Sequence, residues 1–137
     1  MSALLLEGDE LVAAVGESHY QPALSRLCGS DVWEDVAFDC QAVLVPEPDN
    51  AYDHNAIRVE VDSETVAYLS RGDALEYQPA MRQLAKMSML AVCEARIAGR
   101  GRDSPGVTTS NLGIFLRLPT PDEALLQVAE EFIGPEG

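Results

Sequence analysis

The stretch "PEPDNAYDHNAIRVEV" at residues 46–61 joins a proline-bounded polar turn directly to an alternating segment. In its second half, Ile57, Val59 and Val61 alternate with polar residues, which is the period of a β-strand with one buried face. In its first half, Pro46 and Pro48 lack the N–H groups that would continue a strand ladder. The stretch therefore predicts a tight turn that leads into a half-buried strand.

The turn itself is rich in Asp49, Asn50, Asp53 and Asn55, whose short side chains bond nearby backbone groups and tolerate left-handed geometry. One interpretation is structural: a rigid, self-bonded connection that sets the register of the next strand. The other is functional, because a rigid turn also presents acceptors and the ring of Tyr52 at fixed positions, and binding sites often lie on such loops. The residues alone leave both interpretations open.

The rest of the chain shows short strand patterns separated by turns. Strands are expected over residues 10–16, 36–47, 56–62, 65–70, 90–99 and 112–118, helices over 21–29, 72–87 and 120–134, and a loop over 100–111. The segments 56–62 and 65–70 read as a hairpin. A parallel αβα arrangement would need more helices between the strands. The pattern predicts a compact, mostly β barrel with flanking helices.

The helix signals are local. Asp73 is the expected N-cap of the middle helix, and Pro79 is expected to break or restart it. Thr120 is the expected N-cap of the last helix, with Pro121 in its first turn and Glu123 completing a capping box. Gly29 and Gly134 are the expected stops of the first and last helices.

The last helix also carries an apolar stripe at three- and four-residue spacing, formed by Leu125, Val128, Ala129 and Phe132. The stripe is expected to pack on the chain's own barrel, and a surface for a protein partner is the alternative.

With 137 residues and 47% apolar content, the chain fits one domain with a hydrophobic core. The expected organisation is an acidic segment over 1–10, the β-barrel domain over 11–118, and a C-terminal helix with an acidic tail over 119–137. No apolar run reaches the length of a membrane span, and the acidic start is a poor secretory signal. A cytoplasmic location without membrane contact is the simplest expectation.

The net charge is −14, which speaks against strong phosphate binding by the chain as a whole. The charges are segregated, however. Residues 31–64 hold ten acids and one Arg, or −9, whereas residues 65–118 hold seven basic and four acidic groups, or +3. Arg71, Arg100 and Arg102 lie in the basic part and are candidate phosphate contacts.

The residues do not support an enzyme or a metal site. Cys28, Cys40 and Cys93 are odd in number and lack CxxC spacing, so free, buried or half-buried thiols are expected instead of a disulfide framework or a zinc ribbon. A calcium loop that starts at Asp49 is excluded, because its third position lacks an oxygen ligand and its sixth is not glycine. A zinc site formed by His19, His54 and a cysteine has no supporting spacing. No nucleophile–base pair, phosphate loop or cofactor motif is present.

Three segments in this order resemble the HIRAN domain: "VGESHYQPALSRLCG" (15–29), "PEPDNAYDHNAIRVEV" (46–61) and "VAYLSRGDALEYQPAM" (66–81). The resemblance covers about residues 15–118 and is similar to the short, stand-alone bacterial form of the domain. It implies a six-stranded OB-like β-barrel with flanking helices. It also implies a module without catalysis that holds the 3′ end of single-stranded DNA during DNA repair or fork processing.

Matched by position, Asn50, Tyr52 and Asp53 correspond to the N-x-Y-D motif of the family, and Tyr20 corresponds to an aromatic of the first segment. The resemblance implies that the aromatic rings hold the terminal nucleotides and that the aspartate bonds the terminal hydroxyl. His19 and His54 stand where DNA-binding members carry an aromatic and a lysine. The alternative is an accessory or protein-interaction domain that has kept the fold and lost the DNA pocket.

Overall fold

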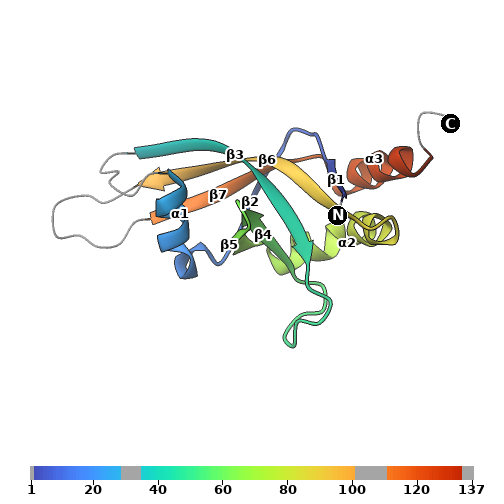
Figure 1. Ribbon diagram of the computed structural model, residues 1–137, viewed down its shortest axis with the longest axis horizontal. Helices are drawn as coiled ribbons and strands as arrows, with labels where there is room; N and C mark the ends of the chain where they lie inside the picture. The colour runs from blue at the N-terminus through green and yellow to red at the C-terminus, as the bar shows by residue number, and fades with distance from the viewer. Residues whose placement is uncertain (1, 29–34, 101–110, 134–137) are drawn as a thin grey trace.

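The computed structural model describes residues 2–28, 35–100 and 111–133. These residues form seven β-strands, three α-helices and one short 3-10 helix (Figure 1). The strands are β1 (Ser2–Leu5), β2 (Glu10–Ala13), β3 (Asp35–Pro46), β4 (Ile57–Val61), β5 (Glu64–Tyr68), β6 (Met89–Arg100) and β7 (Asn111–Leu118). The helices are η1 (Glu17–His19), α1 (Gln21–Cys28), α2 (Arg71–Lys86) and α3 (Pro121–Ile133). The expected fold, mainly β with flanking helices and a C-terminal helix, is confirmed.

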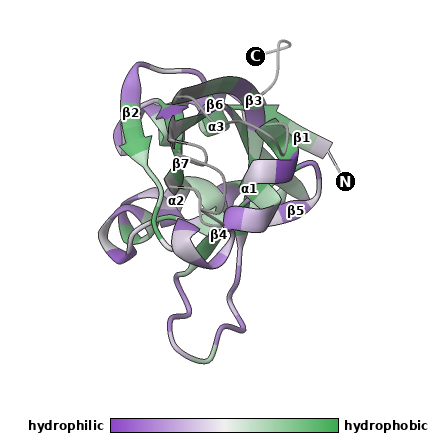
Figure 2. Cartoon of the chain, turned by 90° about the vertical axis from the view of Figure 1, so that its left-hand side faces the viewer, coloured by the Kyte–Doolittle hydropathy of each residue, from purple (hydrophilic) through white to green (hydrophobic). Residues whose placement is uncertain are grey.

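The strands form one sheet in the order β2-β7-β6-β3-β4-β5, and β1 pairs with β6 outside this path. This arrangement differs from a closed six-stranded barrel in strand number and in closure, because no ladder of described residues joins β2 to β5. A single bridge links these two ends: Val15 and Tyr68 exchange backbone hydrogen bonds of 2.7 and 2.9 Å. The sheet therefore curls into a partial ring (Figure 2).

The core lies inside this ring. Ile57, Val59 and Val61 of β4 are buried, and Arg58 and Glu60 are half-buried on the other face, so the predicted alternation is confirmed. The largest fully buried side chains belong to Leu6, Leu24, Leu44, Ile57, Leu84, Ile97, Ile114, Leu116 and Leu118. Burial of apolar side chains from every part of the chain supplies the main stabilising term.

The predicted hairpin between β4 and β5 is also present. Its two turn residues, Asp62 and Ser63, have φ values of 51° and 67°. Positive φ at both central residues is the geometry that matches a two-residue turn to the twist of its strands.

Two predictions about α2 need correction, and the chain's start contains a strand that was not predicted. Residues 2–5 were expected as part of an acidic segment, but they form β1 and pair in parallel with residues 89–92 of β6. The N-cap of α2 is Ser70, whose Oγ accepts a hydrogen bond from the Asp73 N–H at 3.1 Å. Pro79 lies inside a continuous helix, and both it and Leu75, one turn earlier, are exposed. Water can therefore bond the carbonyl that lacks a helical donor.

The capping box of α3 is confirmed. The Thr120 hydroxyl donates to the Glu123 carboxylate at 2.9 Å, and the Glu123 N–H donates to Thr120 Oγ1 at 3.2 Å. The Gln127 side chain exchanges hydrogen bonds of 3.0 and 2.7 Å with the backbone of Glu7. These contacts hold α3 against the N-terminal segment, next to α2 (Figure 1).

The buried face of α3 differs from the predicted stripe. Ala124 and Val128 are fully buried, whereas Leu125 and Ala129 are exposed. The side chain of Phe132 and the expected stops at Gly29 and Gly134 lie outside the described residues, as does the loop from 101 to 110. The prediction was right for Val128 and wrong for Leu125 and Ala129, and Ala124 is buried in their place as the helix packs on its own chain.

We expect Val128→Ala to lower the free energy of unfolding by about 1–3 kcal/mol, because it removes buried methyl groups and leaves a cavity. The matched control is Leu126→Ala on the same helix. Leu126 is 62% exposed, so this change is expected to stay within about 0.5 kcal/mol. Urea unfolding measures both. Equal stability of the two variants would contradict packing of α3 on its own chain.

Candidate nucleic-acid interface

The stretch between β3 and β4, residues 47–56, is called the corner below. Its backbone closes on itself: the Glu47 N–H donates to the Ala56 carbonyl at 2.8 Å, and the Ala56 N–H donates to the Asp53 carbonyl at 3.1 Å. The Asn50 N–H donates to the Glu47 carbonyl at 3.0 Å. The corner is therefore an ordered loop whose ends are fastened at the rim of the sheet.

Two side chains of the corner complete these bonds. Asn50 Oδ1 accepts from the N–H groups of Tyr52 and Asp53, at 2.8 and 3.1 Å. Asp53 Oδ1 accepts from the Asn55 N–H at 2.9 Å. Both are the local side-chain bonds that the Asn and Asp residues predicted. The self-bonded turn expected from the sequence is thus present.

The same bonds decide what the corner presents outward. The Tyr52 side chain is 90% exposed, although its backbone is held by Asn50. Asp53 is half-buried, and within the described part of the chain its second carboxylate oxygen, Oδ2, has no hydrogen-bond donor. An exposed ring and an unused acceptor are therefore carried by consecutive residues on a fixed backbone.

The corner is anchored by Glu47. Asn50 Nδ2 donates to Oε1 at 2.9 Å, while the Tyr68 hydroxyl and Arg58 Nη1 donate to Oε2 at 3.0 and 3.3 Å. Arg58 also donates to Glu60, at 2.6 Å. Burial raises the pKa of Glu47, but the hydrogen bonds from Asn50, Tyr68 and Arg58, with the charge of Arg58, outweigh it and hold the pKa below its usual value.

Tyr68 connects this anchor to the turn before α1. Burial, then the hydrogen bond to Glu47 and the charge of Glu47, raise the pKa of Tyr68 to about 12. The Tyr20 phenol adds a smaller contribution of the same sign. Tyr20 directly follows η1, which packs against β5, the strand that carries Tyr68.

Tyr20 and His19 come from η1. This turn follows Gly16, whose φ of 79° is left-handed and suits glycine. The His19 and Tyr20 rings meet edge to face, with centroids 6.4 Å apart. His19 is exposed and Tyr20 is half-buried, so both rings lie at the surface.

The predicted site residues therefore fall into two groups. Asn50, Tyr52, Asp53 and His54 lie on the corner, and His19 and Tyr20 lie on η1 and just after it. Glu47 and Tyr68, which connect the groups, were not predicted as site residues. The flanking prolines of Glu47 and the polar tip of Tyr68 in an apolar strand were the only signals, and both are weak.

The three candidate phosphate contacts have different outcomes. Arg71 is exposed at the first position of α2, three residues after Tyr68. Arg100 ends β6, but its side chain lies outside the described residues, as does the whole of Arg102. Of these three arginines, only Arg71 can be assigned to the surface, close in sequence to Tyr68.

A groove of about 350 Å³ separates the corner from α2. The corner contributes Pro48, His54 and Asn55, and α2 contributes Gln78 and Arg82. Met81 and Ala85 of α2 also line the groove. Gln78 and Arg82 both bond Asn55: Gln78 Nε2 donates to its carbonyl at 2.8 Å and Arg82 Nη2 to its Oδ1 at 3.3 Å.

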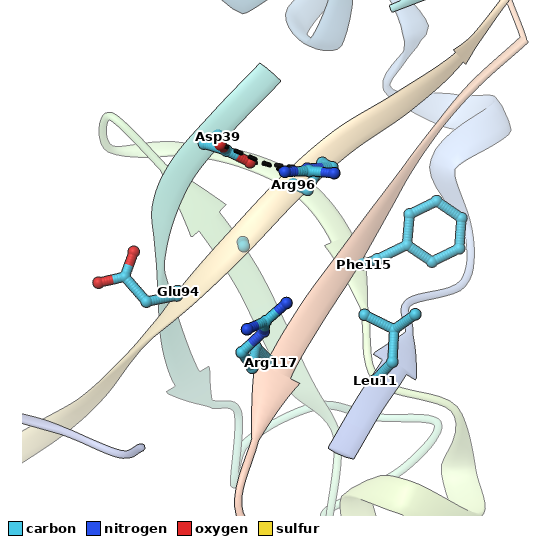
Figure 3. A pocket seen from close by; sticks show the side chains of 7 residues that line it. Leu11, Asp39, Glu94, Arg96, Phe115 and Arg117 are labelled. Atoms are coloured by element: carbon cyan, nitrogen blue, oxygen red, sulfur yellow. Dashed lines mark hydrogen bonds and ion pairs between the residues drawn. The ribbon is translucent and has the colours of Figure 1, made fainter. Parts of the chain in front are cut away.

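A larger hollow, of about 540 Å³, lies elsewhere, on the outer face of β2, β7, β6 and β3 (Figure 3). Arg96 donates to Asp39 at 2.7 Å there, and the hydrogen bond and charge of Arg96 lower the pKa of Asp39. Glu94 points away from Arg117 in this view. Among the described residues, two arginines and two acids balance each other here, and none of the predicted site residues whose side chains are described lines the hollow.

The thiols are free, as expected: Cys28 and Cys40 are half-buried and Cys93 is buried. Burial raises the pKa of all three, to about 11 for Cys40 and about 12 for Cys93. Thiols in this state are poor nucleophiles at neutral pH. In the described ranges, no three His, Cys, Asp or Glu side chains gather as metal ligands, and no helix is long and apolar enough to cross a membrane.

We expect Glu47→Gln to lower the free energy of unfolding by about 1–3 kcal/mol at pH 7, because it removes charge-assisted hydrogen bonds from a half-buried site. A carboxylate whose pKa is lower in the folded than in the unfolded state stabilises the fold at a pH above its unfolded-state pKa. This stabilisation is lost as the pH falls through the folded-state pKa. The difference in the free energy of unfolding between wild type and variant, measured in urea, should therefore become smaller below about pH 4.5. The exposed Glu130→Gln is the control, and a gap that does not change with pH would contradict the assignment.

The sequence matches no protein-family model and no curated protein. The structure is similar to the crystal structure of the HIRAN domain of human HLTF, with a TM-score of 0.38 and 17% sequence identity, over 90% of this chain and 88% of that chain. That domain is of the family that the three sequence segments resemble.

Proposed function

We propose that this chain is a non-catalytic module that binds single-stranded DNA and recognises its 3′ end at the corner. The observation that carries the proposal is the ring of Tyr52, 90% exposed on a backbone that Asn50 fixes. A large aromatic side chain gains nothing for the fold in such a position. It is well placed to stack on a base, which contributes about 1–3 kcal/mol per base and tolerates every base type.

The carboxylate of Asp53 supplies the selectivity for the end. Its Oδ1 is held by the Asn55 N–H at 2.9 Å, which orients the carboxylate and leaves Oδ2 as an acceptor. A terminal 3′ hydroxyl is a donor and suits this oxygen. A terminal 3′ phosphate is an anion and is repelled by it. The sequence resemblance to the HIRAN domain supports the same ligand.

The net charge of −14 sets the strength of binding. With few cations next to the corner, little of the affinity comes from phosphate neutralisation. Tyr20, directly after η1, and the exposed Arg71 extend the surface from the corner towards η1 and α2. We therefore propose weak binding that relies on stacking and on the hydroxyl, at a site formed by both groups of residues.

A second candidate function is a protein-interaction domain. Leu125 and Leu126 of α3 are 37% and 62% exposed, on a helix that Ala124 and Val128 anchor to the chain. This face is separate from the corner. If the second function is the correct one, no oligonucleotide will bind in the experiments below.

Fluorescence anisotropy at low salt with oligonucleotides that end in a 3′ hydroxyl or a 3′ phosphate tests the selectivity. We expect tighter binding of the hydroxyl end. Asp53→Asn, which keeps an oxygen for the Asn55 N–H, is expected to lose about tenfold or more in affinity for that end, since a hydrogen bond to a charged group contributes about 1.5–3 kcal/mol. Asp49→Asn, an exposed change in the same corner, is the control. Equal binding of both ends by the wild type would contradict the proposal.

Stacking is tested at Tyr52. Tyr52→Ala is expected to weaken binding of either oligonucleotide by about fivefold to a hundredfold, which corresponds to the loss of one stacked base. Tyr52→Trp should retain binding. Because the side chain is 90% exposed, neither change should shift the midpoint of thermal unfolding. An alanine variant that binds as tightly as the wild type would show that the ring is not part of the site.

A further inference from the structure

The groove between the corner and α2 carries a feature that the sequence did not indicate. Asn55 lines it and is bonded from α2 by Gln78 at 2.8 Å and by Arg82 at 3.3 Å. The groove also adjoins a second, apolar cavity of about 180 Å³, and the two share Pro46, Met81 and Ala85. The corner and α2 are thus held at a fixed separation. The space between them is polar in the groove and apolar in the adjoining cavity.

Arg82 is the cation among the described residues that line this groove, and none of the described carboxylates pairs with it. Its bond to Asn55 uses one N–H on a neutral amide oxygen. Across the described residues, no carboxylate lies within ion-pair distance of it, although the chain carries 23 acids and nine basic residues. A guanidinium has five donors in a planar fork that matches phosphate oxygens. An exposed, oriented and unpaired arginine in so acidic a chain points to an anionic ligand.

His54 does not compete for this role. Its Nδ1 lies 3.0 Å from the Pro48 carbonyl oxygen, which can only accept, so Nδ1 carries the proton. Its Nδ1 is thus used in a contact within the corner and is not available to a phosphate. The charge that draws an anion into the groove is therefore that of Arg82.

We propose that Arg82 contacts a backbone phosphate of the DNA strand whose 3′-terminal nucleotide lies at Tyr52 and Asp53. This inference rests on the proposed function and extends it: the strand leaves the corner along the groove beside α2. His54 and Asn55 follow Asp53 directly and line the groove, so a nucleotide adjacent to the terminal one reaches Arg82 along the same wall. Pro48 supplies an apolar surface for its sugar.

The experiment measures the salt dependence of binding of a 3′-hydroxyl oligonucleotide to the full chain by anisotropy. Each phosphate contact on a single strand contributes a slope of about −0.7 in log affinity against log salt. Arg82→Gln is expected to reduce the magnitude of the slope by about 0.7 and to weaken binding at low salt, while the preference for the 3′ hydroxyl over the 3′ phosphate is retained. Arg82→Lys, which keeps the charge, should keep most of the slope.

The matched control is Lys86→Gln, one turn further along α2 and also exposed. It should leave the slope within about 0.2 of the wild type if Arg82 makes a direct contact. If the wild type binds but Arg82→Gln has an unchanged slope, or if Lys86→Gln has the same effect, Arg82 is not the contact and only this inference fails. If the wild type binds neither oligonucleotide, the proposed function fails. Binding of an acidic peptide that Arg82→Gln abolishes, without any DNA binding, would also overturn it.

Discussion

The geometry of the candidate site depends on the hydrogen bonds that the carboxylate of Glu47 accepts. This carboxylate takes hydrogen bonds from Asn50 on the corner, from Arg58 on β4 and from Tyr68 on β5, at distances of 2.9 to 3.3 Å. A half-buried charge that lost these donors would be left uncompensated, which is more costly than the bonds are stabilising. The positions of the corner and of Tyr68 are thus set by one group at the end of β3.

The corner shows how a polar turn can serve the fold and a ligand with different atoms. Backbone groups and Oδ1 atoms of Asn50 and Asp53 are consumed in closing the turn, which is the structural interpretation of the sequence. The ring of Tyr52 takes no part in this closure and lies in solvent. The two interpretations of the turn are therefore compatible, since preorganisation by the first lowers the entropy cost of the second.

Local patterns in the sequence predicted the local parts of the structure. The alternation at 57–61, the capping box at Thr120 and the self-bonded turn all depend on residues within a few positions of one another, and all are present. Contacts between distant residues were missed. β1 pairs with a strand more than eighty residues away, and Glu47 meets Tyr68 across a separation of 21 residues. Such pairs depend on register and on closure of the sheet, which neither periodicity nor propensity encodes. The bond of Arg82 to Asn55, across a separation of 27 residues, was missed for the same reason.

The bridge between Val15 and Tyr68 is the junction, called the seam below, at which the two ends of the sheet meet. Two backbone hydrogen bonds join the ends of a sheet whose other neighbours are joined by full ladders. Such a junction opens at a lower free energy than the rest of the sheet. Tyr68 forms one half of this bridge, and Tyr20 follows Val15, its other half, by five residues. A strand of DNA that contacted both Tyr20 and the corner would cross the seam and hold it closed. DNA binding and closure of the ring would then favour each other.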